Sequence, residues 1–342
     1  MPTPTTVTVA ARPDHFEHAQ GTTIASDLDV PWGIAFFPNG DALVSERDTA
    51  RLLRVTPGGR VTKLATVPGV TPTSEGGLLG VAVSPSYARD KKVFVYATTA
   101  QDNRVLAGTL TDFRAGHEHP ILTGIPRGQI HNGGRLGFGP DDMLYASTGE
   151  TGNSSLAQDR DSLGGKLLRI SPDGSIPSDN PFNGSPVWTY GHRNVQGFTW
   201  DRQGRMWASE FGSQIWDEIN LIRPGHNYGW PAAEGTAHLE GMTNPFAVFS
   251  TDAASPSGLA FADGSLWMGA LQGRTTWRLP VKAGGGLGAP VAVRLADART
   301  RTVVTAPDGR LWVTTSDTDG RGTPRDHEDR IIAVQPAAVP GG

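Results

Sequence analysis

The chain has 342 residues, of which 37 % are hydrophobic and 19 % are charged, so it can form a large core and is not expected to be disordered. Its net charge of −4 predicts no nucleic-acid partner, and no apolar stretch is long enough to span a membrane. The lack of cysteine excludes disulfides and thiolate chemistry. The 44 Gly and 26 Pro residues are spread along the chain, which predicts many short elements separated by turns.

The first twenty residues differ in composition from the rest. They contain no basic stretch followed by an apolar one, so they are not a signal peptide. Their Thr, Pro and Ala content predicts a flexible leader over residues 1–20. We expect a single domain over residues 21–337 and a short tail over residues 338–342.

A hairpin pattern, in which two apolar strands flank a turn rich in Pro, Asp, Asn and Gly, recurs along this domain. Further apolar strands follow some copies, starting near Ala50 and Gly164, which indicates about four strands per unit. The copies lie about 45 to 60 residues apart, as propeller blades do. The sequence therefore predicts an all-β, six-bladed β-propeller with four-stranded antiparallel blades. The six copies are residues 32–46, 79–98, 135–148, 197–210, 257–270 and 302–315.

Two loops that precede predicted inner strands carry polar side chains. In the first, His131 is followed by Asn-Gly-Gly, and an imidazole can accept a proton near neutral pH. In the second, Arg193 could pair with a carboxylate or an oxyanion, and Asn194 could donate and accept hydrogen bonds. The alternatives are a solvent-facing His and an Arg that only holds its loop.

Acidic residues stand out at two later positions. Asp217 and Glu218 follow the Gly-rich segment that contains Gly212 and Ser213, and carboxylates together with loop carbonyls are the ligands that calcium prefers. A solvated acidic turn is the alternative. The stretch at residues 317–320, Asp-Thr-Asp-Gly, resembles the start of a calcium loop but lacks the downstream Glu. We interpret it as a long solvated loop of the last blade.

Nearly the whole chain, from about Leu28 to Val334, resembles the soluble quinoprotein sugar dehydrogenases of the glucose/sorbosone dehydrogenase family. No nucleotide- or flavin-binding motif is present, so a redox role requires another cofactor. The resemblance rests on four motifs in family order and spacing: HNGGRL at residues 131–136, GHRN at 191–194, DEIN at 217–220 and NYGWP at 227–231.

The resemblance implies a six-bladed propeller that binds pyrroloquinoline quinone (PQQ) and calcium and oxidises the C1 hydroxyl of aldoses. It implies that His131 is the general base, oriented by Glu150, and that Arg193 takes part in catalysis. Cofactor contacts would come from Glu75, His131, Arg193, Asn194, Arg299 and Arg301. The carbonyls of Gly212 and Ser213 would bind a catalytic calcium, whereas Glu218 and the Tyr228 carbonyl, with Asp217 beside them, would match a second, structural calcium site.

Three positions depart from the family pattern, because Glu75 replaces a Gln, Glu150 an Asp, and Ser213 a Pro. Two alternatives to the dehydrogenase stay open: a calcium-dependent propeller lactonase or other hydrolase, and a binding propeller without cofactor. The resemblance further implies an extracytoplasmic (periplasmic or secreted) location, an electron acceptor of unknown identity, and a monomer or dimer.

Overall fold

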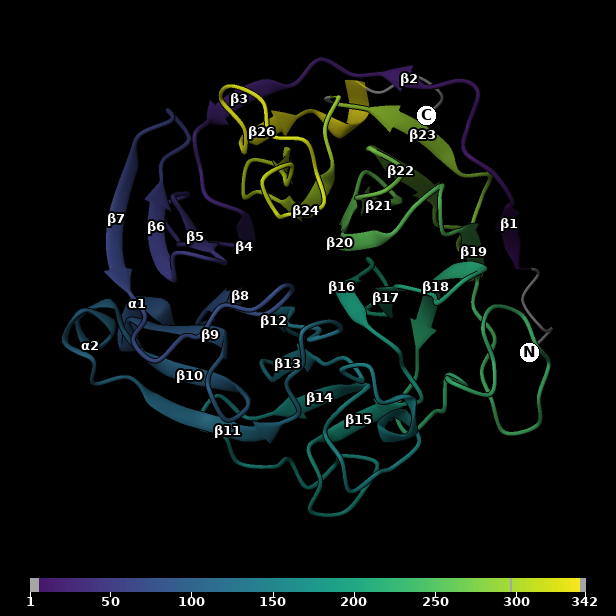
Figure 1. Ribbon diagram of the computed structural model, residues 1–342, viewed down its shortest axis with the longest axis horizontal. Coiled ribbons are helices and arrows are strands. Elements are labelled where there is room, and N and C mark those ends of the chain that lie inside the picture. The colour runs from purple at the N-terminus through teal and green to yellow at the C-terminus, as the bar shows by residue number, and fades with distance from the viewer. Residues whose placement is uncertain (1–5, 296, 339–342) are drawn as a thin grey trace.

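Six sheets surround a central channel as the blades of a propeller (Figure 1). The computed structural model describes residues 6–295 and 297–338. Each repeat in the sequence supplies the first two strands of one blade, which confirms the predicted six-bladed, all-β propeller. The first three blades are β4 (Pro31–Phe36), β5 (Ala42–Glu46), β6 (Arg51–Val55) and β7 (Val61–Thr66); β8 (Leu78–Val83), β9 (Lys92–Thr98), β10 (Asn103–Thr109) and β11 (His119–Ile125); and β12 (Leu136–Phe138), β13 (Leu144–Ser147), β14 (Lys166–Ile170) and β15 (Val187–Tyr190).

The last three blades follow in the same order around the ring. They are β16 (Val195–Trp200), β17 (Met206–Glu210), β18 (Trp216–Ile222) and β19 (Ala247–Ser250); β20 (Pro256–Ala262), β21 (Ser265–Ala270), β22 (Thr275–Pro280) and β23 (Val291–Arg294); and β24 (Thr300–Thr305), β25 (Leu311–Thr315) and β26 (Ile331–Val334) with β3 (Thr22–Ala25). Short helices occupy connections: α1 (Tyr87–Asp90), α2 (Leu110–Ala115) and the 3₁₀ turn Ser154–Ala157; a further 3₁₀ turn, Pro336–Ala338, follows β26. No helix among residues 6–295 and 297–338 has the length and apolarity needed to cross a membrane.

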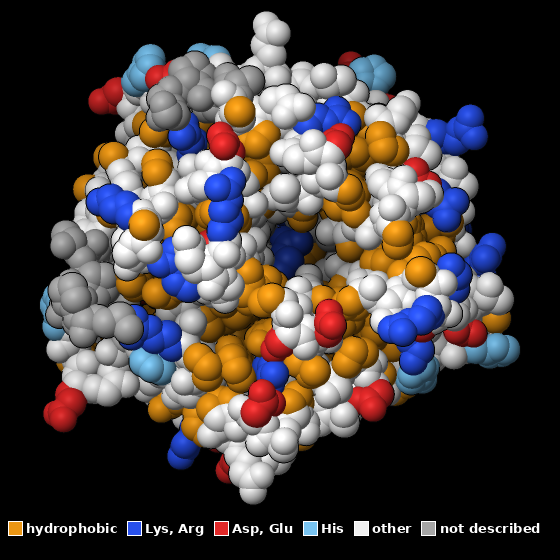
Figure 2. Space-filling model, turned by 180° about the vertical axis from the view of Figure 1, so that it is seen from behind, with side chains coloured by type: hydrophobic (Ala, Val, Ile, Leu, Met, Phe, Trp, Pro, Cys, Tyr) orange, Lys and Arg blue, Asp and Glu red, His pale blue; other side chains and the backbone are white. Residues whose placement is uncertain are grey.

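The first strand of each blade lines the channel, where neighbouring inner strands come close together. Glycine makes this approach possible at equivalent positions. A Cβ added to Gly80 would lie 2.2 Å from the Gly134 carbonyl oxygen, and one added to Gly197 would lie 2.2 Å from the Ser257 carbonyl oxygen. Seen from behind, the channel is a central hollow with a basic side chain at its base (Figure 2).

Apolar side chains from adjacent blades pack together to form the core. Phe94 and Tyr96 of the second blade pack in one buried cluster with Leu144 and Leu168 of the third. The continuous apolar runs therefore place apolar side chains on both faces of a strand, where they contact the neighbouring blades, as expected for blades that pack face to face.

The last blade closes the ring with a strand from the beginning of the domain. β3 pairs antiparallel with β26, with Thr23 opposite Ile332. The last blade therefore takes three strands from the end of the domain and its fourth strand, β3, from the beginning (Figure 1).

The segment before β3 differs from the flexible leader that its composition predicts. Its described part, from Thr6 on, contains β1 (Val7–Val9), which pairs in parallel with β19, and β2 (Glu17–His18), which pairs in parallel with β23. Phe16 packs beside them, 3.8 Å from the Arg294 guanidinium carbon. The open edges of two outer strands and a few apolar contacts explain the pairing. Residues 1–5 and 339–342, in the expected leader and tail, lie outside the described residues.

Candidate functional site

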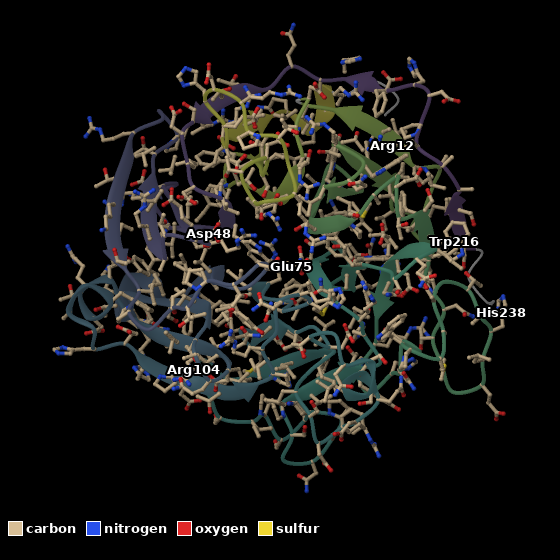
Figure 3. The ribbon with its side chains drawn as sticks, viewed as in Figure 1. Arg12, Asp48, Glu75, Arg104, Trp216 and His238 are labelled. Carbon is tan, nitrogen blue, oxygen red and sulfur yellow. The ribbon has the colours of Figure 1, made fainter. Side chains whose placement is uncertain are left out.

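The candidate site residues gather at one end of the channel because of how a blade is built. The inner strand begins, and the antiparallel second strand ends, at the same end of the blade. His131 and Arg193 lie just before the inner strands β12 and β16, whereas Glu150 and Glu210 follow or end the second strands β13 and β17. Glu75, from the loop before β8, also lies near the centre of the ring (Figure 3).

His131 and Glu150 form a direct pair between imidazole Nδ1 and carboxylate Oε1. Their side chains are 12 % and 3 % exposed. Burial alone would raise the pKa of Glu150, but hydrogen bonds from His131 and the Gly152 N–H outweigh it and lower the pKa. The carboxylate is therefore ionised and orients the ring through Nδ1. The structure brings together the two residues that the sequence assigns to base and orienting carboxylate.

A cavity of about 270 Å³ is lined by three of the expected cofactor residues, Glu75, Arg299 and Arg301, but not by His131 or Glu150. Arg47 and Arg321 also line it. Glu75 links the cavity to His131, since Glu75 Oε2 accepts the backbone N–H of His131 at 2.9 Å. The cavity is strongly basic, which suits an anionic ligand.

Asp319 holds the two arginines of the last blade in place. Its Oδ2 accepts Arg299 Nη2 at 3.2 Å and Arg301 Nη2 at 2.8 Å. Burial raises the pKa of Asp319, but the two guanidinium groups outweigh this effect and lower the pKa to about 2. Asp317 and Asp319 are 0 % and 6 % exposed, so the interpretation of this stretch as solvated is wrong: the buried arginines need a buried counter-charge.

Arg193 and Asn194 lie across from that cluster and already have protein partners. Arg193 Nη1 donates to the Gly212 carbonyl at 2.5 Å, and its guanidinium carbon lies 5.4 Å from the Trp230 ring centroid. Asn194 is 1 % exposed, and its Oδ1 accepts the Gly133 N–H at 3.0 Å. Asn194 thus holds the glycine loop that follows His131 in place. This structural role is additional to the cofactor contact that the sequence predicts.

The residues assigned to calcium divide into two groups. Asp217 lies inside β18, and its two carboxylate oxygens accept the N–H groups of Gly212 at 2.8 Å and Ser255 at 2.7 Å. Burial raises the pKa of Asp217 to about 7. The Ser213 N–H donates to Glu234, which collects four successive backbone N–H groups, so this loop is organised around a carboxylate.

The second group surrounds a small cavity of about 10 Å³, about the size of one water molecule or ion. Gly212, Glu218 and Tyr228 line it, together with Glu210 and Glu234. Burial and the neighbouring Glu210 raise the pKa of Glu218 to about 8. No group of three or more His, Asp or Glu side chains has metal-binding geometry within the described parts of the chain. A cation here would therefore need carbonyl or amide oxygens as well.

The sequence patterns did not assign four residues that the structure places in these clusters. Arg321 and Asp319 belong to a loop interpreted as solvated, and Glu234 is a single Glu in an irregular segment. Glu210 ends a repeat and could have been found by its position. Its equivalent in the first blade, Glu46, is also fully buried at the end of a second strand.

A family model described as Glucose / Sorbosone dehydrogenase matches residues 28–324. Aldose sugar dehydrogenase YliI of Escherichia coli is 30 % identical over 336 residues, which cover 86 % of this chain and 89 % of that protein. Quinoprotein glucose dehydrogenase B of Acinetobacter calcoaceticus is 33 % identical over 256 residues, which cover 64 % of this chain and 54 % of that protein.

A solved structure of the PQQ-bound form of aldose sugar dehydrogenase from Streptomyces coelicolor superimposes with a TM-score of 0.87 at 50 % identity, covering 95 % of this chain and 99 % of that chain. The soluble aldose sugar dehydrogenase of Escherichia coli, in its apo form, gives a TM-score of 0.82 at 28 % identity, covering 93 % and 99 %. With the sequence motifs, the propeller and the match over most of its length, the chain belongs to the glucose/sorbosone dehydrogenase family.

Proposed function

We propose that this protein is a quinoprotein aldose dehydrogenase that oxidises the C1 hydroxyl of aldoses to the lactone, with PQQ as cofactor. The observation that carries the proposal is the His131–Glu150 pair, which Glu75 links to an arginine-lined cavity. The 50 % identity to a PQQ-bound aldose sugar dehydrogenase supports the same cofactor and substrate class. An extracytoplasmic location and an electron acceptor of unknown identity belong to the same proposal.

The residues of the cavity fit PQQ, which carries three carboxylates. Arg47, Arg299, Arg301 and Arg321 line the cavity, against Glu75 and Asp319. Arginine forks are well suited to hold carboxylates. Asp48 pairs with Arg47 at 2.6 Å, so four guanidinium groups face three carboxylates and leave an excess of one positive charge for an anionic ligand. Arg299 and Arg301 would hold carboxylates of the cofactor.

Arg135 is a further cation that contacts Trp32 and Gln196, two residues that line the cavity. It is buried, stacks 4.4 Å from the Trp32 ring centroid, and donates to the Gln196 carbonyl at 2.9 Å and to Thr302 Oγ1 at 3.1 Å. Both acceptors are uncharged. Burial, and then repulsion from Arg301, lower the pKa of Arg135 to about 9. A buried cation without a charged partner favours an anion nearby.

The chemistry of the chain's own residues is a proton transfer. His131 Nε2 takes the proton of the C1 hydroxyl as the hydride leaves the same carbon, and Glu150 stabilises the imidazolium that results. When bound, PQQ supplies the quinone that accepts the hydride. The sugar loses two electrons and two hydrogens and becomes the lactone, so the reaction balances with one two-electron acceptor.

Calcium belongs to the proposal through Gly212, Ser213, Asp217, Glu218 and Tyr228. The best support comes from Glu218, a buried carboxyl beside Glu210 and next to Asn220, whose buried Oδ1 has no hydrogen-bond partner among the described residues. Buried oxygen ligands around a cavity of about ionic size suit a hard cation. At the carbonyls of Gly212 and Ser213, a bound calcium would supply a Lewis-acid charge beside the cofactor, whereas at Glu218 and Tyr228 it would be structural.

Reconstitution tests the proposal. Apo-protein mixed with PQQ and calcium should gain the absorbance of bound quinone and oxidise several aldoses with an artificial electron acceptor. A protein that binds PQQ but oxidises no aldose would contradict the substrate class. A protein that binds no PQQ but hydrolyses aldonolactones would instead be the calcium-dependent lactonase, and one that does neither would be a binding propeller.

A further inference from the structure

We propose that Arg321 is a positioning residue of the cofactor pocket, which acts through an ion pair with Glu75. The pair neutralises a carboxylate that would otherwise repel an anionic cofactor, and it supports the backbone of His131. The inference rests on the proposed function in naming PQQ as the anion.

Both carboxylate oxygens of Glu75 are in use. Oε1 lies 2.7 Å from Arg321 Nη2, and Oε2 accepts the His131 N–H at 2.9 Å. Glu75 lies on the loop before β8 and Arg321 on the loop between β25 and β26, so the pair joins two blades that are far apart in sequence. Both residues line the same 270 Å³ cavity.

The charge of Glu75 is what makes Arg321 necessary. The family pattern has a neutral Gln at this position, whereas a carboxylate here faces a ligand that is itself anionic. Arg299 and Arg301 both form ion pairs with Asp319, whereas Glu75 forms its ion pair with Arg321. The Arg321 N–H also donates to Asp319 Oδ1 at 2.9 Å, which fixes its loop to the same cluster. The substitution at position 75 is therefore balanced by a cation from the last blade.

The pair also reaches the catalytic base. His131 has a φ of 53°, in the left-handed region that side chains seldom adopt. The hydrogen bond from its N–H to Glu75 stabilises this conformation, while Glu150 orients the ring. Without Arg321, Glu75 would be free to turn toward solvent and release the His131 loop.

A set of charge variants tests the proposal by PQQ affinity of the apo-protein, measured by titration at low and at high salt. Arg321→Gln should weaken binding by about tenfold at low salt and less at high salt, because the exposed Glu75 charge repels the ligand. Arg321→Lys, which keeps the charge, should bind nearly as wild type. Glu75→Gln should bind at least as tightly as wild type, and the double variant Glu75→Gln/Arg321→Gln should regain most of the lost affinity. Arg325→Gln is the matched control, since Arg325 lies on the same loop but faces Asp297 at 3.3 Å.

Equal affinity of Arg321→Gln and wild type would overturn the proposal, as would a double variant no better than Arg321→Gln. Hydrogen exchange of the His131 amide in the apo-protein gives a second test without cofactor. Arg321→Gln should speed this exchange several-fold, and Arg325→Gln should not. If wild type binds no PQQ, the proposed function fails, and the exchange rates still decide whether Arg321 acts on His131 through Glu75.

Discussion

His131 is held on two sides, by Glu75 at its N–H and by Glu150 at its ring, so its substitution should remove a positioned base without opening the fold. His131→Ala should lower the rate of quinone reduction in a single turnover by about 10²–10⁴-fold, the usual contribution of a positioned base, with PQQ affinity nearly unchanged. The exposed His117→Ala is the control. A rate within a few-fold of wild type would show that His131 is not the base.

Glu150 should matter through orientation rather than by its own titration. Its pKa is lowered, so the carboxylate stays ionised from about pH 5 upward. Glu150→Gln should therefore reduce turnover throughout pH 6 to 9, whereas Glu150→Asp, the usual family residue, should keep substantial activity. Full turnover of Glu150→Gln anywhere in that range would contradict this role.

Asp319 should contribute to stability in a pH-dependent way. Its pKa of about 2 lies below the value near 4 of an unfolded Asp, so its contribution is present above pH 4 and is lost as the pH falls toward 2. The difference corresponds to about 2.6 kcal/mol. The free energy of unfolding of Asp319→Asn, measured by urea denaturation, should fall below that of wild type by at least this amount at pH 6, with a smaller gap at pH 3. A gap independent of pH would show that Asp319 acts by packing alone.

At the scale of single elements, β18 and the loop before it should respond to calcium. Calcium bound at the Glu218 cavity would stabilise the native state by about 2.7 kcal/mol at 100 times its dissociation constant. Chelation should therefore lower the melting temperature by several degrees, and added calcium should restore it. Glu218→Gln should lose this response, whereas Glu240→Gln, an exposed Glu beyond the cavity, should keep it. A wild-type melting curve that chelation leaves unchanged would contradict the site.

The elements that the sequence predicted best are those whose signal is local. Hairpins such as residues 197–210 carry their own turn and apolar strands, so β16 and β17 follow from the sequence alone. β1 and β2 do not, because their short segments become strands only by pairing with the exposed edges of β19 and β23. Their partner strands lie more than 200 residues away in the sequence, so the composition of the segment cannot predict the pairing.

The same distinction holds for the candidate site. The sequence singled out His131 and Glu150 by resemblance, and the fold brings their side chains together. Arg321 was not singled out, and Asp319 was interpreted as part of a solvated loop, because their loop is polar and irregular, and polar loops are usually solvated. Only the ring arrangement brings that loop against Glu75 and the two buried arginines. Clusters made by side chains from distant blades need the tertiary structure.

At the scale of the whole molecule, the ring is closed where β3, from the start of the domain, pairs with β26, from its end. No covalent connection links these two strands directly, so non-covalent contacts alone close the ring. The inner strands of adjacent blades contact one another around the channel, including β24 against β4. Opening the joint would expose the edge of β26 and separate the first and last blades. Stability should therefore depend more on β3 than on an outer strand held within a local hairpin.

Two proline substitutions compare these strands. Thr23 pairs with Ile332 at the joint, and Thr62 pairs with Arg54 in the hairpin of β6 and β7; both threonines are exposed on outer strands. Proline removes a backbone donor and costs about 3 kcal/mol or more in a regular element. Thr62→Pro should therefore lower the melting temperature by only a few degrees in a chain of this size. Thr23→Pro should lower it at least twice as much and cause association at high protein concentration, because the freed β26 edge can pair with another chain. Scanning calorimetry with light scattering measures both effects, and equal shifts without association would show that the joint is no weaker than any single blade.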